Sequence, residues 1–162
     1  LPISGDYVPL SEQDATCWLQ PMIEEAEQIL IAAERMGRIG RFQLEAAIQS
    51  MHARRAFTGS TDWEAIALLY EGLVRLAPTT GALVSRAAAV AEARGATIGW
   101  AQLATIAPET VKNYQPYWAV AAHLLMRMKR LDEASAAYSR AIGLCEDPAM
   151  REFLRRQAPP AR

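Results

Sequence analysis

The 162-residue sequence has few of the features that mark disulfide-rich, metal-binding or membrane-spanning proteins. Its two cysteines, Cys17 and Cys145, are too few for a disulfide framework or a cysteine-rich zinc site. We interpret both as reduced thiols of a cytoplasmic protein. No apolar run reaches the roughly 18 residues that a membrane span requires. The formal net charge of −1 gives no overall attraction to nucleic acid or to an anionic membrane.

Groups that carry catalysis or bind metals are also scarce. His52 and His123 are the only histidines, and neither has a carboxylate at the i+4 spacing of a helical metal pair. The segment at 37–40 comes closest to a phosphate-binding loop, but it lacks the following lysine. No signal peptide is recognisable. Because the chain begins at Leu1, we expect a fragment of a longer protein. Because the motifs above are scarce, we expect no catalytic, metal-binding or cofactor-binding residues.

What the sequence does contain is a period of 34 residues. Ala134, Tyr138 and Ala141 recur 34 positions earlier as Trp100, Ala104 and Ala107, and again as Ile66, Tyr70 and Leu73. In the preceding helices, Phe57, Ala91 and Leu125 keep the same step. A helix-turn-helix unit of this length is typical of tetratricopeptide repeats, which bury their apolar faces by stacking on one another.

Apolar periodicity and turn residues predict helices alone. We expect them at about 12–36, 41–57, 63–76, 80–94, 98–106, 114–128, 131–143 and 148–157. Expected N-caps are Thr61 or Asp62, Thr79 or Thr80, and Asp147. Pro78, Gly95 and Pro108 are each expected to end a helix. We expect a loop at 109–113, after Pro108.

The predicted fold is all-α: a tetratricopeptide-like α-solenoid of stacked helical hairpins. Three repeats, at about 47–80, 81–114 and 115–148, stand between terminal capping helices. The expected organisation is an extended lead-in at 1–11, a single helical domain at 12–157 and a frayed tail at 158–162. Most of the tryptophans should anchor the core, while one or two should line a groove where such repeats bind partners.

Polar side chains on an otherwise apolar helix suggest a contact surface. We select Gln43, Gln49, His52 and Arg55 as candidate partner contacts. Two basic clusters allow two interpretations: they balance charge at helix ends, or they contact DNA phosphates or an acidic protein. The clusters are Arg35, Arg38, Arg41, Arg54 and Arg55, and Arg127, Lys129, Arg130, Arg151, Arg155 and Arg156.

Several strings, taken in order and spacing, point to one family. They are GRFQLEAAI at 40–48, TDW at 61–63, LYEGLVRLAP at 69–78, AAAVAE at 87–92, LDEA at 131–134 and REFL at 151–154, with His52–Ala53 and Ala137–Tyr138. Over about residues 12–157 the chain resembles the tetratricopeptide-like C-terminal region of bacterial extracytoplasmic-function (ECF) RNA polymerase sigma factors.

The resemblance implies a regulatory, protein-interacting role in transcription initiation. The full protein would carry two N-terminal domains that read the promoter and bind core polymerase. This segment would then contact its own N-terminal sigma domains, the polymerase core or a regulator. It would meet DNA only through the missing domains, and it would meet no membrane. It carries over no catalytic residue.

Two alternatives stay open from the sequence. One is a general tetratricopeptide-like, peptide-binding scaffold unrelated to transcription. The other is an enzyme or small-molecule sensor, which would require a deep polar pocket with convergent titratable groups. The sequence contains no pattern that predicts such a pocket.

Overall fold

The computed structural model describes residues 40–160, and this part of the chain consists of helices without a strand. The prediction of an all-α protein is therefore confirmed for these residues. The expected lead-in at 1–11, the helix at 12–36 and residues 161–162 of the tail lie outside the described residues, as do Cys17 and Trp18. The helices are α2 (Arg41–Ala53), α3 (Arg55–Thr58), α4 (Trp63–Leu76), α5 (Thr80–Arg94), α6 (Ala96–Leu103), α7 (Pro108–Val111), α8 (Gln115–Arg127), α9 (Leu131–Leu144) and α10 (Pro148–Gln157).

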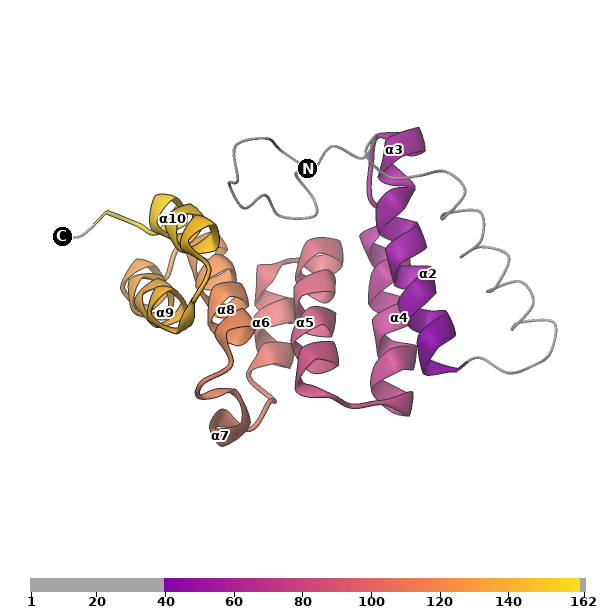
Figure 1. Ribbon diagram of the computed structural model, residues 1–162, viewed down its shortest axis with the longest axis horizontal. Coiled ribbons are helices and arrows are strands. Elements are labelled where there is room, and N and C mark those ends of the chain that lie inside the picture. The colour runs from indigo at the N-terminus through magenta and orange to yellow at the C-terminus, as the bar shows by residue number, and fades with distance from the viewer. Residues whose placement is uncertain (1–39, 161–162) are drawn as a thin grey trace.

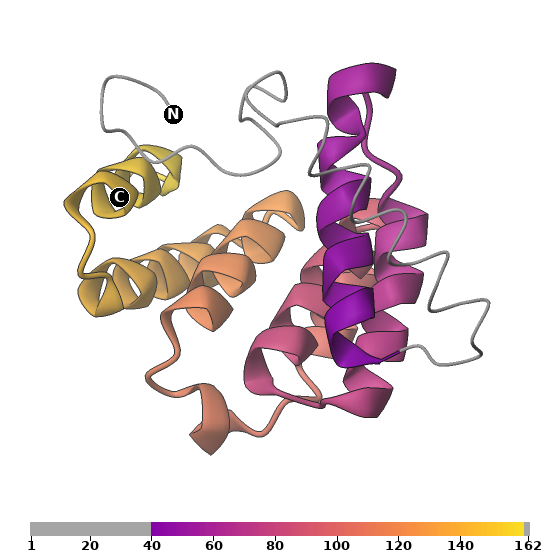
Figure 2. The same ribbon diagram turned by 45° about the vertical axis from the view of Figure 1, so that its right-hand side comes forward.

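The longer helices follow one another in chain order across the molecule (Figure 1). Helix α2 packs on α4, α4 on α5, α5 on α6, α6 on α8, and α8 on α9, while α10 covers part of α9. Short loops join α4 to α5 and α8 to α9, as expected for antiparallel neighbours. Figure 2 shows α2 nearly upright and α8 and α9 oblique, so the helix axes turn from one end of the row to the other.

Three predicted N-caps are confirmed. The Asp62 side chain accepts a hydrogen bond from the Ala65 N–H at 3.0 Å, and the Thr79 hydroxyl accepts one from the Ala82 N–H at 3.2 Å. Asp147 accepts from the first turn of α10 in the same way. Each cap satisfies a backbone donor that has no partner within its own helix. These residues therefore fix where α4, α5 and α10 begin.

The prediction for 98–113 is wrong in two respects. Helix α6 runs over Ala96–Leu103 instead of 98–106, and Pro108 opens helix α7 inside the expected loop at 109–113. Proline at the first position of a helix loses no hydrogen bond, because that N–H has no intrahelical acceptor. Ala104 and Ala107 follow the end of α6 at Leu103 and are exposed, so they do not repeat the burial of Tyr138 and Ala141.

The expected helix at 41–57 is divided near its end. Arg54 separates α2 from α3, where the Phe57 N–H bonds to the Arg54 carbonyl, a tighter turn than the α-helical one. Phe57 is 59% exposed, whereas Ala91 and Leu125 are buried. The 34-residue equivalence of Phe57 with these two positions therefore fails in burial. Gly59, with φ 72°, follows the end of α3 in a left-handed conformation that glycine adopts readily.

Two hydrophobic clusters form the interior, and α5 contributes to both. Ala82, Ala89 and Val90 face an N-terminal cluster made with α2 and α4. Val84, Ala87 and Ala91 face a C-terminal cluster made with α6, α8 and α9. Small side chains on α5 allow its neighbours to approach closely from both sides. The alanine-rich sequence at 87–91 thus serves as a partition between the clusters.

The closest approach is between α5 and α6 at Gly99. A Cβ placed on Gly99 would lie 2.8 Å from the Ala87 carbonyl oxygen and would also overlap the Ala91 side chain. Both alanines are fully buried. Only glycine fits this crossing without moving one helix.

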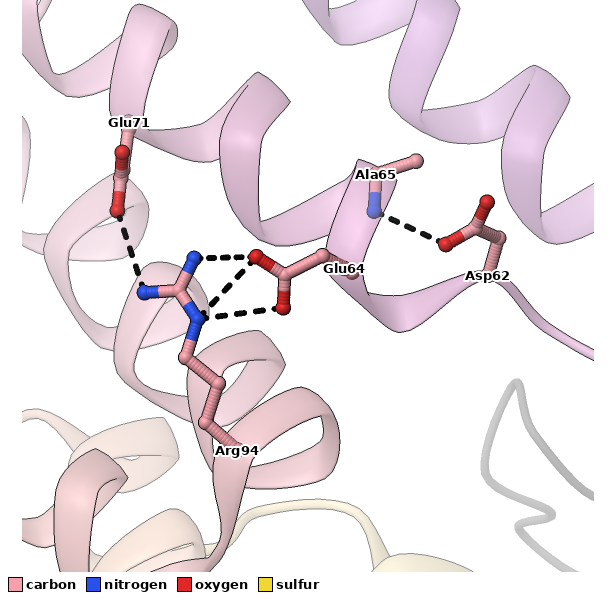
Figure 3. Close-up of polar contacts among 5 residues, drawn as sticks. All are labelled: Asp62, Glu64, Ala65, Glu71 and Arg94. Carbon is pink, nitrogen blue, oxygen red and sulfur yellow. Dashed lines mark hydrogen bonds and ion pairs between the residues drawn. The ribbon is translucent and has the colours of Figure 1, made fainter.

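Ion pairs at the C-terminal end of α5 join it to its neighbours. The Arg94 Nε donates to both Glu64 carboxylate oxygens at 3.2 Å, and its Nη1 lies 3.8 Å from Glu71 (Figure 3). This interaction lowers the pKa of Glu64 and raises that of Arg94. Two residues earlier on α5, Glu92 lies 3.2 Å from Arg127 and 3.6 Å from His123 of α8. Helix α5 is therefore linked electrostatically to both α4 and α8.

We expect Gly99→Ala to destabilise the protein by about 1–3 kcal/mol, because overpacking forces α5 and α6 apart. Gly143→Ala is the matched control, since nothing lies within 4 Å of a Cβ at this helical position. Alanine there should stabilise by about 0.5 kcal/mol through its higher helix propensity. Urea unfolding of both variants measures the difference. Equal effects of the two substitutions would contradict the close packing at Gly99.

Candidate functional site

A groove with an aromatic floor opens between α6, α8 and α9. Its volume is about 420 Å³. Helix α6 has 8 residues, whereas α8 has 13 and α9 has 14, so α6 does not run far enough to cover their first and last turns. The residues that line this aromatic groove are Trp100, Tyr117, Trp118, Ala121, Leu125, Glu133, Ala136, Ala137 and Arg140.

Tyr117 and Trp118 in the first turn of α8 are held in position by contacts with their neighbours. The Trp118 indole N–H donates to the Lys112 carbonyl at 3.1 Å, and the Tyr117 ring meets the Trp118 ring edge to face at 5.1 Å. Burial raises the pKa of Tyr117, so its hydroxyl stays protonated at neutral pH. The prediction that one or two tryptophans line a groove is met by Trp100 and Trp118.

Two arginines stand over the tryptophans and differ in their partners. The Arg130 guanidinium lies 5.2 Å from the Trp100 ring centre and bonds to both Glu133 oxygens, at 2.8 and 2.6 Å. The Arg140 guanidinium lies 5.9 Å from the Trp118 ring centre. It donates to the Lys112 carbonyl at 2.8 Å and to the Asn113 amide oxygen at 2.9 Å.

These partners give the groove an uneven charge. The Arg130–Glu133 pair is balanced, and the guanidinium lowers the pKa of Glu133. Both hydrogen-bond acceptors of Arg140 are neutral, and within residues 40–160 no carboxylate lies at ion-pair distance from it. Lys112 next to it is exposed. One end of the aromatic groove therefore carries uncompensated positive charge.

A second, smaller hollow of about 170 Å³ lies between α2, α4 and α5. Burial raises the pKa of the Tyr70 hydroxyl, the Ser85 side chain lowers it, and the Glu45 carboxylate raises it further. This hollow is the polar groove, and it is lined by Glu45, Ile48, Gln49, Tyr70, Leu73, Thr79, Gly81, Ala82 and Ser85.

The four candidate contacts chosen from the sequence do not share one patch. Gln49 is exposed and lines the polar groove. His52 is partly buried, and its ring meets the Trp63 ring edge to face at 5.4 Å. Gln43 and Arg55 are also partly buried, and the Nη1 of Arg55 is enclosed without a hydrogen-bond partner.

Sequence reasoning missed Arg140 because no neighbouring residue marks it as special. The signal that was present is the short helix that the sequence predicts at 98–106. Arg140 comes to lie over Trp118 only through the packing of α9 against the segment at 112–118.

The second basic cluster is largely balanced by neighbours. Arg127 pairs with Glu92, Arg155 and Arg156 lie near Glu152, and Arg151 donates to the Cys145 carbonyl. These contacts favour the interpretation in which charges balance within the fold. The pairs are largely exposed and each contributes little to stability.

Two further findings concern the described part of the chain. Between residues 40 and 160, no three His, Cys, Asp or Glu side chains lie close enough to hold a metal ion together. No helix in the same stretch is long and apolar enough to cross a membrane.

Among curated proteins, the chain is similar to an uncharacterized protein of Rhizobium meliloti (strain 1021), with 37% identity over 156 residues. The match covers 95% of this chain and 36% of the relative, so the chain spans about a third of the relative's length. No family model matches the sequence, and no solved structure matches the chain. The relative's name states no activity, so function has to be inferred from geometry and sequence.

The environment of His52 generates a prediction about pH. Burial lowers the pKa of His52 below its usual value of 6.5. The folded protein therefore binds this proton more weakly than the unfolded chain does, and the free energy of unfolding should fall as the pH drops below about 6.5. An NMR titration should give a His52 midpoint below 6.5, and Trp63→Ala should raise it by exposing the ring. A midpoint that is insensitive to Trp63 would contradict the contact as its cause.

Proposed function

We propose that this chain is the regulatory C-terminal domain of an ECF RNA polymerase sigma factor. It acts in the cytoplasm and supports or controls transcription initiation through protein contacts. The proposal combines the resemblance of residues 12–157 with a described body that consists of helices. The match to a relative of which 64% lies outside the shared region is compatible with a domain of a longer protein.

The finer architecture that we propose is a tetratricopeptide-like stack of three hairpins, formed by α2 with α4, α5 with α6, and α8 with α9. In the third hairpin Leu125, Ala134, Tyr138 and Ala141 are all buried at the spacing such repeats use. The turning helix axes in Figure 2 support this arrangement. The middle hairpin departs from the pattern, because α6 is short.

The observation that carries the interaction role is the aromatic groove. Tryptophan, tyrosine and arginine contribute most to binding energy in protein interfaces, and they do so from partly enclosed positions. Here Trp100, Tyr117 and Trp118 form a floor with Arg140 at one end. The groove is open rather than enclosed, which suits a segment of a protein better than a small molecule. We propose no catalytic role for it.

In this mechanism, a sigma domain, the polymerase core or a regulator places an apolar side chain on the floor of the groove. Arg140 then meets a carboxylate of the partner. The occupied groove fixes the position of this domain relative to the promoter-reading domains, and so changes their access to polymerase or promoter. Gln49 in the polar groove is a secondary contact candidate.

The test uses the full-length protein in transcription reconstituted with core polymerase. We expect deletion of residues 40–160 to change promoter-specific output. Ala136→Arg should reproduce the effect, because it fills the groove from an exposed position of α9. Ser139→Arg is the matched control, since Ser139 is exposed on the same helix but does not line the groove.

Unchanged output and regulation after deletion would rule out a functional requirement for this region. The alternative, a general peptide-binding scaffold unrelated to transcription, has its own signature. Affinity capture with the wild-type chain would then recover a peptide partner but no polymerase or sigma domain, and Ala136→Arg would abolish the capture.

A further inference from the structure

The walls of the aromatic groove carry small side chains. Ala121 of α8 and Ala136 and Ala137 of α9 line it beside the Trp118 ring. Within residues 40–160, Ala136 is exposed. The distance between two packed helices depends on the side chains at their contact, so alanines let the backbone of a further helix come close. An aromatic floor between low walls is the form of groove that receives an amphipathic helix.

The length of the groove along α9 corresponds to about two helical turns. Glu133 and Arg140 both line it, and they are seven residues apart on this helix. At a rise of 1.5 Å per residue, their separation along the axis is about 10 Å. A helix that lies along the groove therefore places residues about one and two turns apart on its floor.

The lining also favours a helix over an extended segment. An extended segment needs partners for its own N–H and C=O groups, whereas a helix satisfies most of them internally. The lining is mostly alanine, leucine and tryptophan. The Trp118 indole N–H already donates to the Lys112 carbonyl. Few polar groups of the groove are therefore left for the backbone of an extended occupant.

The two ends of the groove differ in the charge that they accept. At one end, Arg130 bonds to both oxygens of Glu133, so this carboxylate is already paired. At the other end, Arg140 makes both of its bonds to neutral acceptors through Nη2. Its Nε and Nη1 hydrogens have no acceptor within residues 40–160, and Lys112 beside it is exposed. A carboxylate of the occupant therefore belongs at the Arg140 end.

We propose that the occupant of the aromatic groove is a short amphipathic helix of a partner protein. It places an Asp or Glu at Arg140 and large apolar residues three or four and seven positions away on the aromatic floor. This inference rests on the interaction role proposed above, and it adds the conformation and the charge pattern of the partner segment.

Selection of peptides on the full chain tests the chemistry of the occupant. The probe is a phage library of random peptides of about 14 residues, or four helical turns. After counter-selection on Ala136→Arg, whose side chain fills the groove, the enriched peptides should share the carboxylate and the apolar spacing, without an intervening proline. Ser139→Arg, exposed on α9 outside the groove, should bind them like the wild type. Enriched peptides without a carboxylate, or equal enrichment on Ala136→Arg, would overturn the proposal.

A double-mutant cycle tests the contact with Arg140, with binding of a dye-labelled enriched peptide measured by fluorescence anisotropy. Replacing the carboxylate of the peptide by its amide should weaken binding to the wild-type chain roughly fivefold. The same replacement should have no effect on Arg140→Gln. Arg127→Gln is the matched control, since Arg127 pairs with Glu92, and it should keep the fivefold effect. An equal loss on Arg140→Gln and on the wild type would contradict the proposed contact.

The conformation is tested with the same peptide. Proline at a central position on its solvent face should weaken binding more than tenfold, because it breaks the helix, whereas alanine there should preserve binding. A tolerated proline would overturn the helical occupant. The transcription assay gives a separate answer. Helical binding with transcription unchanged by the deletion supports this inference and refutes the regulatory role, while groove-dependent transcription with peptides of another chemistry refutes this inference alone.

Discussion

The close packing of α5 is the constraint on which the rest of this structure depends. Its alanines face two clusters at once, and Gly99 lets α6 cross it at contact distance. A larger side chain on either side would separate the clusters, since interiors of this density do not absorb an added methyl group without strain. The positions of α4 on one side and of α6 and α8 on the other therefore follow from the small residues of one helix.

The aromatic groove depends on the short length of α6, which has 8 residues. A helix as long as α4 in the place of α6 would cover Trp118 and the end of α9. Instead, Pro108 starts the short helix α7, and the chain continues to Lys112. The Lys112 carbonyl accepts hydrogen bonds from the Trp118 indole N–H and from the Arg140 guanidinium. The backbone at Lys112 thus fixes the Trp118 and Arg140 side chains, which line the aromatic groove.

The helical content and most element boundaries could be predicted because they depend on local chemistry. Asp62, Thr79 and Asp147 accept hydrogen bonds from their own helices, and Gly59 and Gly95 adopt positive φ at helix ends. Pro108 could not be assigned from sequence alone, since proline both follows helices and starts them. The groove could not be predicted either, because Trp100 and Arg140 come to line one groove only through tertiary packing across α6, α8 and α9. The environments of Gln43, Gln49, His52 and Arg55 on α2 and α3 also depend on tertiary packing, which the sequence does not give.

The ion pairs of Arg94 and Glu92 at the end of α5 depend on solution conditions, whereas the alanine contacts of this helix do not. Arg94 holds α4 and Glu92 holds α8 through largely solvent-exposed side chains, whose attraction is screened by dissolved salt. The van der Waals contacts beneath them are indifferent to salt. Dissolved salt therefore weakens the polar links at this end of α5 and leaves the apolar contacts that hold the helices together nearly unchanged.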